Sequence, residues 1–210
     1  MRPLSTDTQE KSRDSRYRVL CLANWDYRRG LDRLLDLAEV FKKRGDKAVQ
    51  IIIAGNMKLR RSDPGYLGVA GRKGGTLEKV ARQHGLTDEE ILFLDHVTNP
   101  EAVLASCDAV IKPTRESNPW GRDIIEGMAA GKPVLSVGSW DRFIRHKDTG
   151  ILIPIWDAEE FANEILYLAH NRDASDSMGD RAQKHIASLC GPERAKDLAA
   201  FWCSVNRRQS

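Results

Sequence analysis

Residues 113–138 read PTRESNPWGRDIIEGMAAGKPVLSVG, and this stretch indicates the fold. The apolar run 108–112 precedes it and predicts a strand that ends in a proline. Gly121 opens a short predicted helix, Gly131 ends it, and Pro133 prevents its continuation before another apolar strand. The stretch is therefore the end of a strand that leads into a helix N-terminus, where free backbone N–H groups attract anions.

The same stretch carries side chains that a simple connection does not need. Glu116, Asn118 and Trp120 fall on the predicted loop, and Glu126 falls on the predicted helix. A carboxylate, an amide and an indole next to a helix N-terminus are suited to binding a polar ligand that carries negative charge. We interpret residues 113–138 as the centre of a ligand site.

The composition is that of a globular domain. The chain has 210 residues, enough for one domain with short appendages, and 41% of them are apolar, which disfavours a disordered chain. Thirty-three basic residues against 30 acidic ones give a net charge of +3, which is no reason to propose nucleic-acid binding. The cysteines and histidines lack metal-ligand spacing, so we expect no metal site. Without a transmembrane-length run or a signal peptide, we expect a cytoplasmic protein that reaches a membrane only through a partner.

Apolar runs and helical periodicity alternate along the chain between two polar tails, 1–16 and 206–210, which leave a domain over 17–205. The predicted strands are 17–23, 49–54, 91–94, 108–112, 134–137 and 150–154. The predicted helices are 31–41, 76–84, 100–107, 121–131, 157–170, 175–189 and 193–205.

This alternation predicts an α/β fold, a doubly wound Rossmann-like parallel sheet with helices on both faces. Ligands of such folds bind beyond the carboxyl ends of the strands. The loops 24–30 and 113–121 both follow strands, so both are expected at that edge. No G-x-G-x-x-G follows a strand, which disfavours a nicotinamide dinucleotide.

The segment 55–75 is rich in glycine and basic residues and shows little periodicity. A connection of this length in a compact domain is usually functional or disordered. We expect a loop without regular structure that is mobile in the free protein and closes over the ligand as a lid.

Several of these motifs together resemble the C-terminal, nucleotide-sugar-binding domain of retaining glycosyltransferases of the two-domain B-type fold (glycosyl transferases group 1, family 4). The family pattern E-x-F-G-x-x-x-x-E-A-M-A-x-G-x-P-V matches NPWGRDIIEGMAAGKPV from Asn118 onward. Four shorter matches occur in family order. They are RG at 29–30 with its LxxLL helix, the strand ending in AG at 54–55, ASCDAVIKPT at 105–114, and GILIP at 150–154.

The resemblance implies a donor site for a nucleotide-diphosphate sugar. Glu126 would accept hydrogen bonds from the ribose hydroxyls, and the backbone around Trp120 and Gly121 would meet the diphosphate or the sugar. Arg29 stands where the family has a lysine that neutralises the diphosphate. The implied reaction transfers a hexose with retention and needs no metal ion. The acceptor site would come from an N-terminal domain or a partner subunit.

The sequence departs from the family pattern at three positions. Asn118 replaces the first glutamate of the motif, and Glu116 is then a candidate to supply the carboxylate. Asn24 replaces a phosphate-binding arginine, and Arg142 replaces a glutamate in the loop after the fifth strand. No catalytic residue is assigned. The substitutions leave an alternative open, a non-catalytic nucleotide-sugar-binding or scaffold subunit. A sugar-nucleotide epimerase fits less well, because no acid–base cluster is evident.

The predicted last helix carries an apolar stripe that needs a cover. Either the domain's own core or another protein surface would serve. The stripe consists of Ala195, Leu198, Ala199, Trp202 and Val205.

Overall fold

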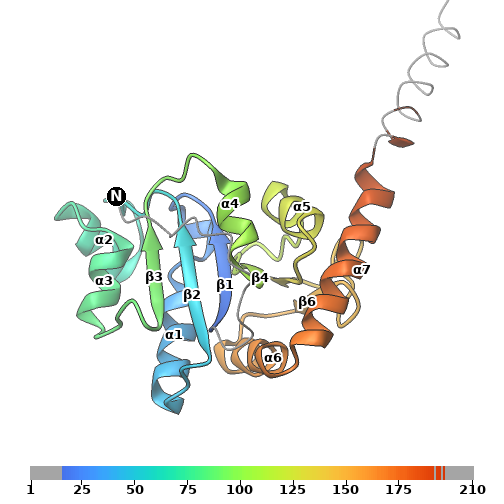
Figure 1. Cartoon of the computed structure of the whole chain (residues 1–210). Helices are drawn as coiled ribbons and strands as arrows, with labels where there is room; N and C mark the ends of the chain where they lie inside the picture. The colour runs from blue at the N-terminus through green and yellow to red at the C-terminus, as the bar shows by residue number, and fades with distance from the viewer. Residues whose placement is uncertain (1–15, 192, 195, 197–210) are drawn as a thin grey trace, which may run out of the picture.

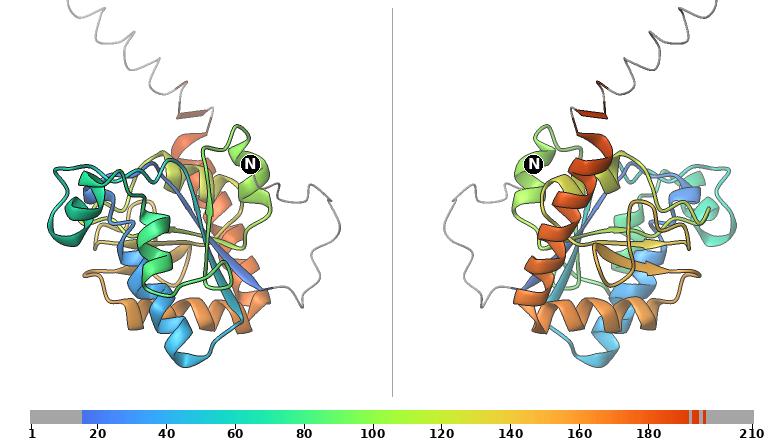
Figure 2. Two further views of the ribbon diagram at one scale, coloured as in Figure 1. Left: turned by 90° about the vertical axis from the view of Figure 1, so that its left-hand side faces the viewer. Right: turned by 90° about the vertical axis from the view of Figure 1, so that its right-hand side faces the viewer.

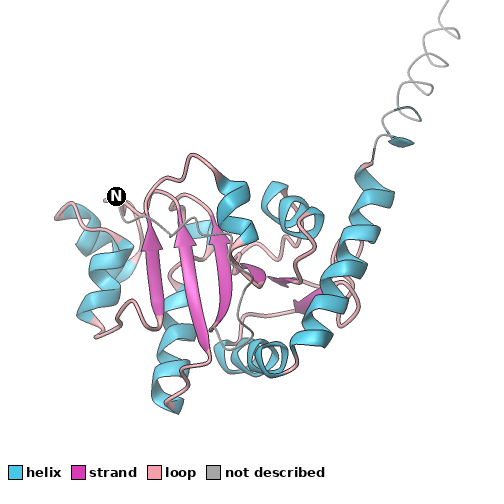
Figure 3. Ribbon diagram, in the orientation of Figure 1, coloured by secondary structure: helices cyan, strands magenta, loops and turns pink. Residues whose placement is uncertain are grey.

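The computed structural model of the protein describes residues 16–191, 193, 194 and 196. Six strands form one parallel sheet in the order β3-β2-β1-β4-β5-β6 (Figures 1 and 3). This is the strand order of doubly wound dinucleotide-binding folds, so the predicted fold class is confirmed. The strands are β1 (Tyr17–Leu22), β2 (Val49–Ala54), β3 (Ile91–Leu94), β4 (Ala109–Lys112), β5 (Val134–Val137) and β6 (Gly150–Ile153).

Helices cover both faces of the sheet (Figure 2). One face packs against the first and sixth helices and the other against the fourth, fifth and seventh. The helices are α1 (Arg33–Arg44), α2 (Gly65–Arg72), α3 (Leu77–Gln83), α4 (Pro100–Ala105), α5 (Arg122–Ala129), α6 (Ala158–His170) and α7 (Arg172–Cys190), with a 3-10 turn, η1, at Tyr27–Arg29.

The continuously apolar strands produce this two-sided core. Successive side chains of a strand point to opposite faces. On β1, Val19 and Cys21 belong to the core under α1 and α6, whereas Leu20 belongs to the core under α4, α5 and α7. A strand that is buried on both faces must be apolar at nearly every position, which is the pattern seen in the sequence. The buried Gln50 of β2 is an exception, and its amide donates to the Asp88 carbonyl at 2.6 Å.

The central strands β1 and β4 are paired over a short register. Val19 lies opposite Ala109, and Leu20 lies opposite Val110. On its other side, β1 pairs with β2 along its whole length, from Tyr17 to Leu22. The sheet is therefore least tightly joined at the carboxyl ends of its two central strands.

The segment 55–75 contains regular structure, so the expectation of a structureless loop is wrong for residues 65–72. Helix α2 occupies these residues and buries Leu67. The indole Nε1 of Trp25, which is itself buried, donates to the Asp63 carboxylate at 2.8 Å. Leu59 is also buried and bonds through its backbone to Gly75. These contacts attach parts of the segment to the rest of the domain, although most of its residues are exposed, and its closure over a ligand stays a prediction.

Two other expectations concern the C-terminal part. The helix predicted over 175–189 begins earlier, at Arg172, as α7. Apart from 193, 194 and 196, the helix predicted over 193–205 and its apolar stripe lie outside the described residues. No helix in the described part of the chain is long and apolar enough to cross a membrane.

Candidate functional site

The loops that follow β1 and β4 are joined to each other through backbone atoms. Gly30 has φ +71°, and a Cβ there would lie 2.2 Å from the carbonyl oxygen of Pro113, so only glycine fits this crossing. The guanidinium of Arg33 donates to the carbonyls of Pro113 and Thr114 at 3.0 and 2.7 Å. These contacts hold the two loops in one fixed relation.

A second tie between the same loops is a largely buried ion pair. Arg115 donates to both carboxylate oxygens of Asp32, at 2.8 and 2.6 Å, and to the Tyr27 carbonyl at 2.8 Å. Its guanidinium also lies 3.9 Å from the centre of the Tyr27 ring. The sequence analysis missed this pair, because its members are 83 positions apart and only the fold brings them together.

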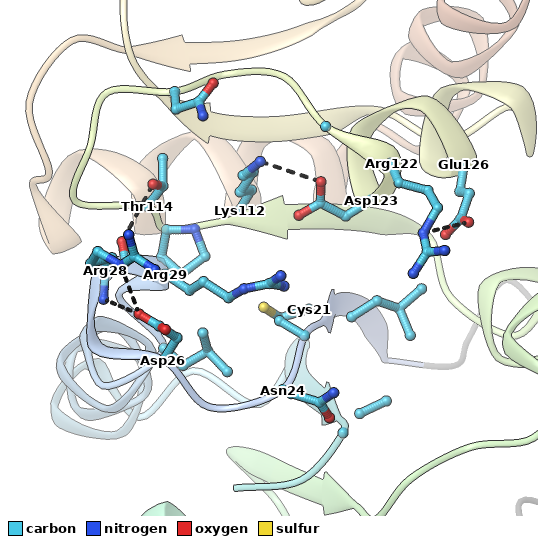
Figure 4. A pocket seen from close by; sticks show the side chains of 18 of the residues that line it. Cys21, Asn24, Asp26, Arg28, Arg29, Lys112, Thr114, Arg122, Asp123 and Glu126 are labelled. Carbon is cyan, nitrogen blue, oxygen red and sulfur yellow. Dashed lines mark hydrogen bonds and ion pairs between the residues drawn. The ribbon is translucent and has the colours of Figure 1, made fainter. Parts of the chain in front are cut away.

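A pocket of about 700 Å³ lies at the carboxyl ends of β1, β2 and β4, under the N-terminus of α5 (Figure 4). Its volume is within the usual range for small-molecule sites. All the candidate residues from the sequence line it: Asn24, Arg29, Glu116, Asn118, Trp120, Gly121 and Glu126. The sequence analysis had not singled out several other lining residues, among them Asp26, Arg28, His96, Lys112, Thr114, Arg122 and Asp123.

Most charged side chains around the pocket are paired. Arg28 contacts Asp26 at 3.3 Å and Glu116 at 3.8 Å. The other three pairs are Arg60–Asp26, Lys112–Asp123 and Arg122–Glu126, at 3.5, 3.3 and 3.5 Å. In these pairs the negative charges of the Asp and Glu side chains at the pocket are compensated by basic side chains.

Arg29 differs from its neighbours. Among the described residues its guanidinium has no ion pair and no hydrogen bond. It is exposed and extends across the pocket toward Cys21 (Figure 4). Arg29 is thus a cation with all its donors available to a ligand.

The N-terminus of α5 forms the pocket's upper wall. Gly121 precedes the helix with φ +138°, and no side chain caps it there. Asp123 accepts from the backbone N–H of Ile124 at 3.1 Å. Glu126 stands one turn further along, with its side chain 41% exposed. This wall presents helix N–H groups and a half-buried carboxylate to the same space, which suits an anionic group that is joined to hydroxyls.

The residues at the departures from the family pattern lie in different places. Asn24 is in the pocket wall, where its side-chain oxygen accepts from the backbone N–H of Asn56 at 2.9 Å. Asn118 also lines the pocket. Arg142 does not line it, and its carbonyl oxygen is bonded to the His185 ring at 2.8 Å.

Cys21 lies on the floor of the pocket but is unsuited to nucleophilic chemistry. Burial raises the pKa of its thiol to about 12, and Asp123 adds to this, while Arg29 and Lys112 oppose it. A thiol with this pKa stays protonated at neutral pH. In the part of the chain that the structure describes, no three His, Cys, Asp or Glu side chains form a group that could hold a metal ion.

The fold and the site define a Rossmann-like ligand-binding domain, with its pocket at the strand ends where such folds bind nucleotides. Residues 5–185 match the family Glycosyl transferases group 1. The chain belongs to this family.

Curated relatives agree with this assignment. The D-inositol 3-phosphate glycosyltransferase of Nocardia farcinica is 30% identical over 176 residues, covering 74% of this chain and 38% of that protein. A GDP-mannose-dependent alpha-(1-6)-phosphatidylinositol monomannoside mannosyltransferase of Mycobacterium tuberculosis is 25% identical over 181 residues, covering 81% of this chain and 43% of the relative. The chain therefore spans about two-fifths of the length of these relatives.

Solved structures show the same fold. HepE from Anabaena, in complex with UDP-glucose, superimposes with a TM-score of 0.66 at 20% identity, covering 90% of this chain and 50% of HepE. The C-terminal domain of LpcC, a glycosyl transferase group 1 family protein of Francisella tularensis, gives 0.65 at 18% identity and covers 83% and 86% of the two chains. The resemblance to the C-terminal domain of a B-type glycosyltransferase is confirmed.

Proposed function

We propose that the pocket binds a nucleotide-diphosphate sugar and that the chain is the donor half of a retaining glycosyltransferase. The observation that carries the proposal is the convergence of Arg29, the N-terminus of α5 and Glu126 on one pocket at the strand ends. An unpaired cation and helix N–H groups suit a diphosphate, and a carboxylate suits the ribose hydroxyls.

The same arrangement suits the chemistry of transfer. When the bond between the anomeric carbon and the phosphate oxygen breaks, the electron pair stays on the nucleoside diphosphate, which gains negative charge. A fixed cation and amide dipoles stabilise that charge where it develops. In this proposal Arg29 and the α5 N-terminus serve the leaving group, and no metal ion is needed for the step.

The proposal includes a second domain or subunit that supplies the acceptor site and the rest of the catalytic groups. Its support is the share of the relatives that the chain covers, 38% and 43%. The alternative function, a non-catalytic nucleotide-sugar-binding or scaffold subunit, is supported by the neutral amides at Asn24 and Asn118.

Isothermal titration with UDP and GDP tests donor binding. Glu126→Gln should weaken binding of the preferred nucleotide by about 1.5–3 kcal/mol, because a charge-assisted hydrogen bond is lost. Arg29→Ala should weaken diphosphate binding more than nucleoside binding. Glu160→Gln, at an exposed position of α6 outside the pocket, is the matched control and should bind like the wild type. Failure of the wild type to bind either nucleotide would contradict the proposal.

Sugar transfer assays then separate the two functions. The chain is mixed with donor, acceptor and candidate partner domains, and product formation and donor hydrolysis are both followed. A transferase should turn over only with its partner, whereas a scaffold subunit should bind donor and never turn over. Efficient transfer by the purified chain alone would refute the dependence on a partner.

A further inference from the structure

Lys112 is a cation in the pocket wall to which the sequence analysis assigned no role. It is the last residue of β4, and its side chain is only 16% exposed. Its ammonium donates to the carbonyl oxygen of Trp120 and lies 3.3 Å from an Asp123 carboxylate oxygen. Both partners belong to the start of α5, so the ammonium is held at the helix N-terminus that borders the pocket (Figure 4).

The ammonium has one donor left for a ligand. A lysine has three N–H groups, and two described partners, Trp120 and Asp123, account for two of them. The site is also crowded on the protein side, because a Cβ on Gly121 would come 2.9 Å from this nitrogen and 2.8 Å from the Asp123 oxygen. Lys112 also lines the pocket, so the remaining N–H is available to a ligand there.

The positive charges of Lys112 and Arg29 both influence the Cys21 thiol, which lies on the pocket floor. Both cations lower the pKa of the Cys21 thiol from the value that burial alone would set, which places both charges near the end of β1. They arrive from different loops, one after β1 and the other at the end of β4. On the β1 side the neutral Asn24 contributes no charge, and its oxygen is bonded to Asn56.

We propose that Lys112 is a second diphosphate-binding residue, which supplies from β4 the positive charge that Asn24 does not supply from the first loop. The proposal rests on the proposed donor site. When a diphosphate occupies the pocket, one of its oxygens accepts the third N–H of Lys112. Asp123 orients the ammonium, but its negative charge repels the phosphate and competes with it for the same cation.

Binding of UDP, GDP and inorganic pyrophosphate to a set of variants tests this role. Lys112→Met should weaken the preferred nucleotide and pyrophosphate alike, by about 10- to 100-fold, because a hydrogen bond to a charged group is lost. Lys112→Arg keeps the charge and should restore most of the affinity. Lys47→Met, at an exposed position in the turn before β2, removes the same charge away from the pocket and should change nothing.

Asp123→Asn separates a ligand role from a merely structural one. Asparagine keeps an oxygen for Lys112 and for the Ile124 N–H but removes the negative charge, so pyrophosphate should bind as tightly as to the wild type or more tightly. If Asp123→Asn weakens binding as much as Lys112→Met does, the pair only holds the loop and the proposal is wrong. Thermal denaturation checks that each variant is folded.

The outcomes also distinguish the two proposals. A wild-type chain that binds UDP or GDP, with Lys112→Met binding equally well, overturns the role of Lys112 and leaves the donor site standing. If the wild type binds pyrophosphate but neither UDP nor GDP, and Lys112→Met weakens pyrophosphate binding, the result supports the role of Lys112 and contradicts the nucleotide site. A chain that binds none of the three probes overturns both.

Discussion

The pair between Arg115 and Asp32 should be the strongest single tie between the two loops that form the pocket. Its side chains are 22% and 10% exposed, and it is joined by two hydrogen bonds. Arg115→Met leaves the Asp32 carboxylate largely buried without its counter-charge. Removing one partner of a buried pair typically costs about 3–5 kcal/mol. Because Arg115 keeps some contact with water, we expect the lower end, about 3 kcal/mol of unfolding free energy.

Urea denaturation followed by circular dichroism measures this cost. Arg44→Met is the matched control, because Arg44 pairs with Glu159 at the surface, where the Glu159 side chain is 63% exposed. An exposed pair contributes about 1 kcal/mol at most. The double variant Asp32→Leu/Arg115→Met removes both charges and should be less destabilised than the sum of the single variants. This role of the pair is refuted if Arg115→Met lowers the unfolding free energy no more than Arg44→Met does. It is also refuted if the effects of Asp32→Leu and Arg115→Met on the unfolding free energy are additive.

Three further predictions concern other parts of the chain. Gly30→Ala places a Cβ 2.2 Å from the Pro113 carbonyl oxygen and a side chain on a residue with φ +71°. It should lower the unfolding free energy by at least about 1–2 kcal/mol and weaken UDP or GDP binding. Gly45→Ala, with φ +67° and no neighbour within 4 Å, should cost only the strain of a left-handed backbone. The pKa of Asp26 lies below its usual range because the backbone N–H and the guanidinium of Arg28 donate to it. A carboxylate with a lowered folded-state pKa stabilises the fold above its unfolded pKa of about 3.9, and this stabilisation is lost as the pH falls through the folded-state value. Asp26→Asn should therefore be less stable than the wild type at pH 7, and the difference should shrink as the pH falls below the unfolded-state pKa; a difference that does not change with pH would contradict this cause. The segment 55–75 should show amide protection in hydrogen exchange without ligand over α2, because this helix is formed and buries Leu67, and full exchange there would support the lid hypothesis.

The fold could be predicted because each strand carries its own signal. Strands such as β2, with the sequence VQIIIA, are apolar at all positions but one, and the glycines and prolines between elements mark where each ends. The parallel sheet follows from connections that alternate with helices, whereas the strand order, in which β4 pairs with β1, was not predicted. None of these inferences needs knowledge of contacts between distant residues.

Helix α2 could not be predicted from local preference. Its sequence GYLGVAGR contains three glycines, which are poor helix formers. Two of them are needed for packing, because a Cβ on Gly68 would come 2.0 Å from the Asp63 carbonyl and one on Gly71 would come 2.2 Å from that of Arg60. Tertiary packing, including the burial of Leu67, outweighs the weak propensity.

The site was only partly readable for a similar reason. Glu126, Gly121 and Arg29 stand in recognisable motifs, and the structure brings them to one pocket. Lys112 and Arg115 were missed because their significance depends on partners that only the folded chain supplies. A lysine at the end of a strand carries no signal of its own in the sequence, and its contacts with Asp123 and the Trp120 carbonyl appear only in the folded chain.

Because β1 and β4 pair over only two positions, the sheet helps to form the pocket as well as the loops. Beyond Leu20 and Val110 the two strands are no longer paired, and Cys21, Leu22 and Lys112 line the opening. Side chains of α1 share a core with one face of these strands, and side chains of α5 share a core with the other face. Substitutions in the core beneath the pocket would therefore change its width, while substitutions in the loops would change what it recognises. An engineer who wished to admit a larger sugar would begin with the core side chains and keep the loop side chains for choosing the donor.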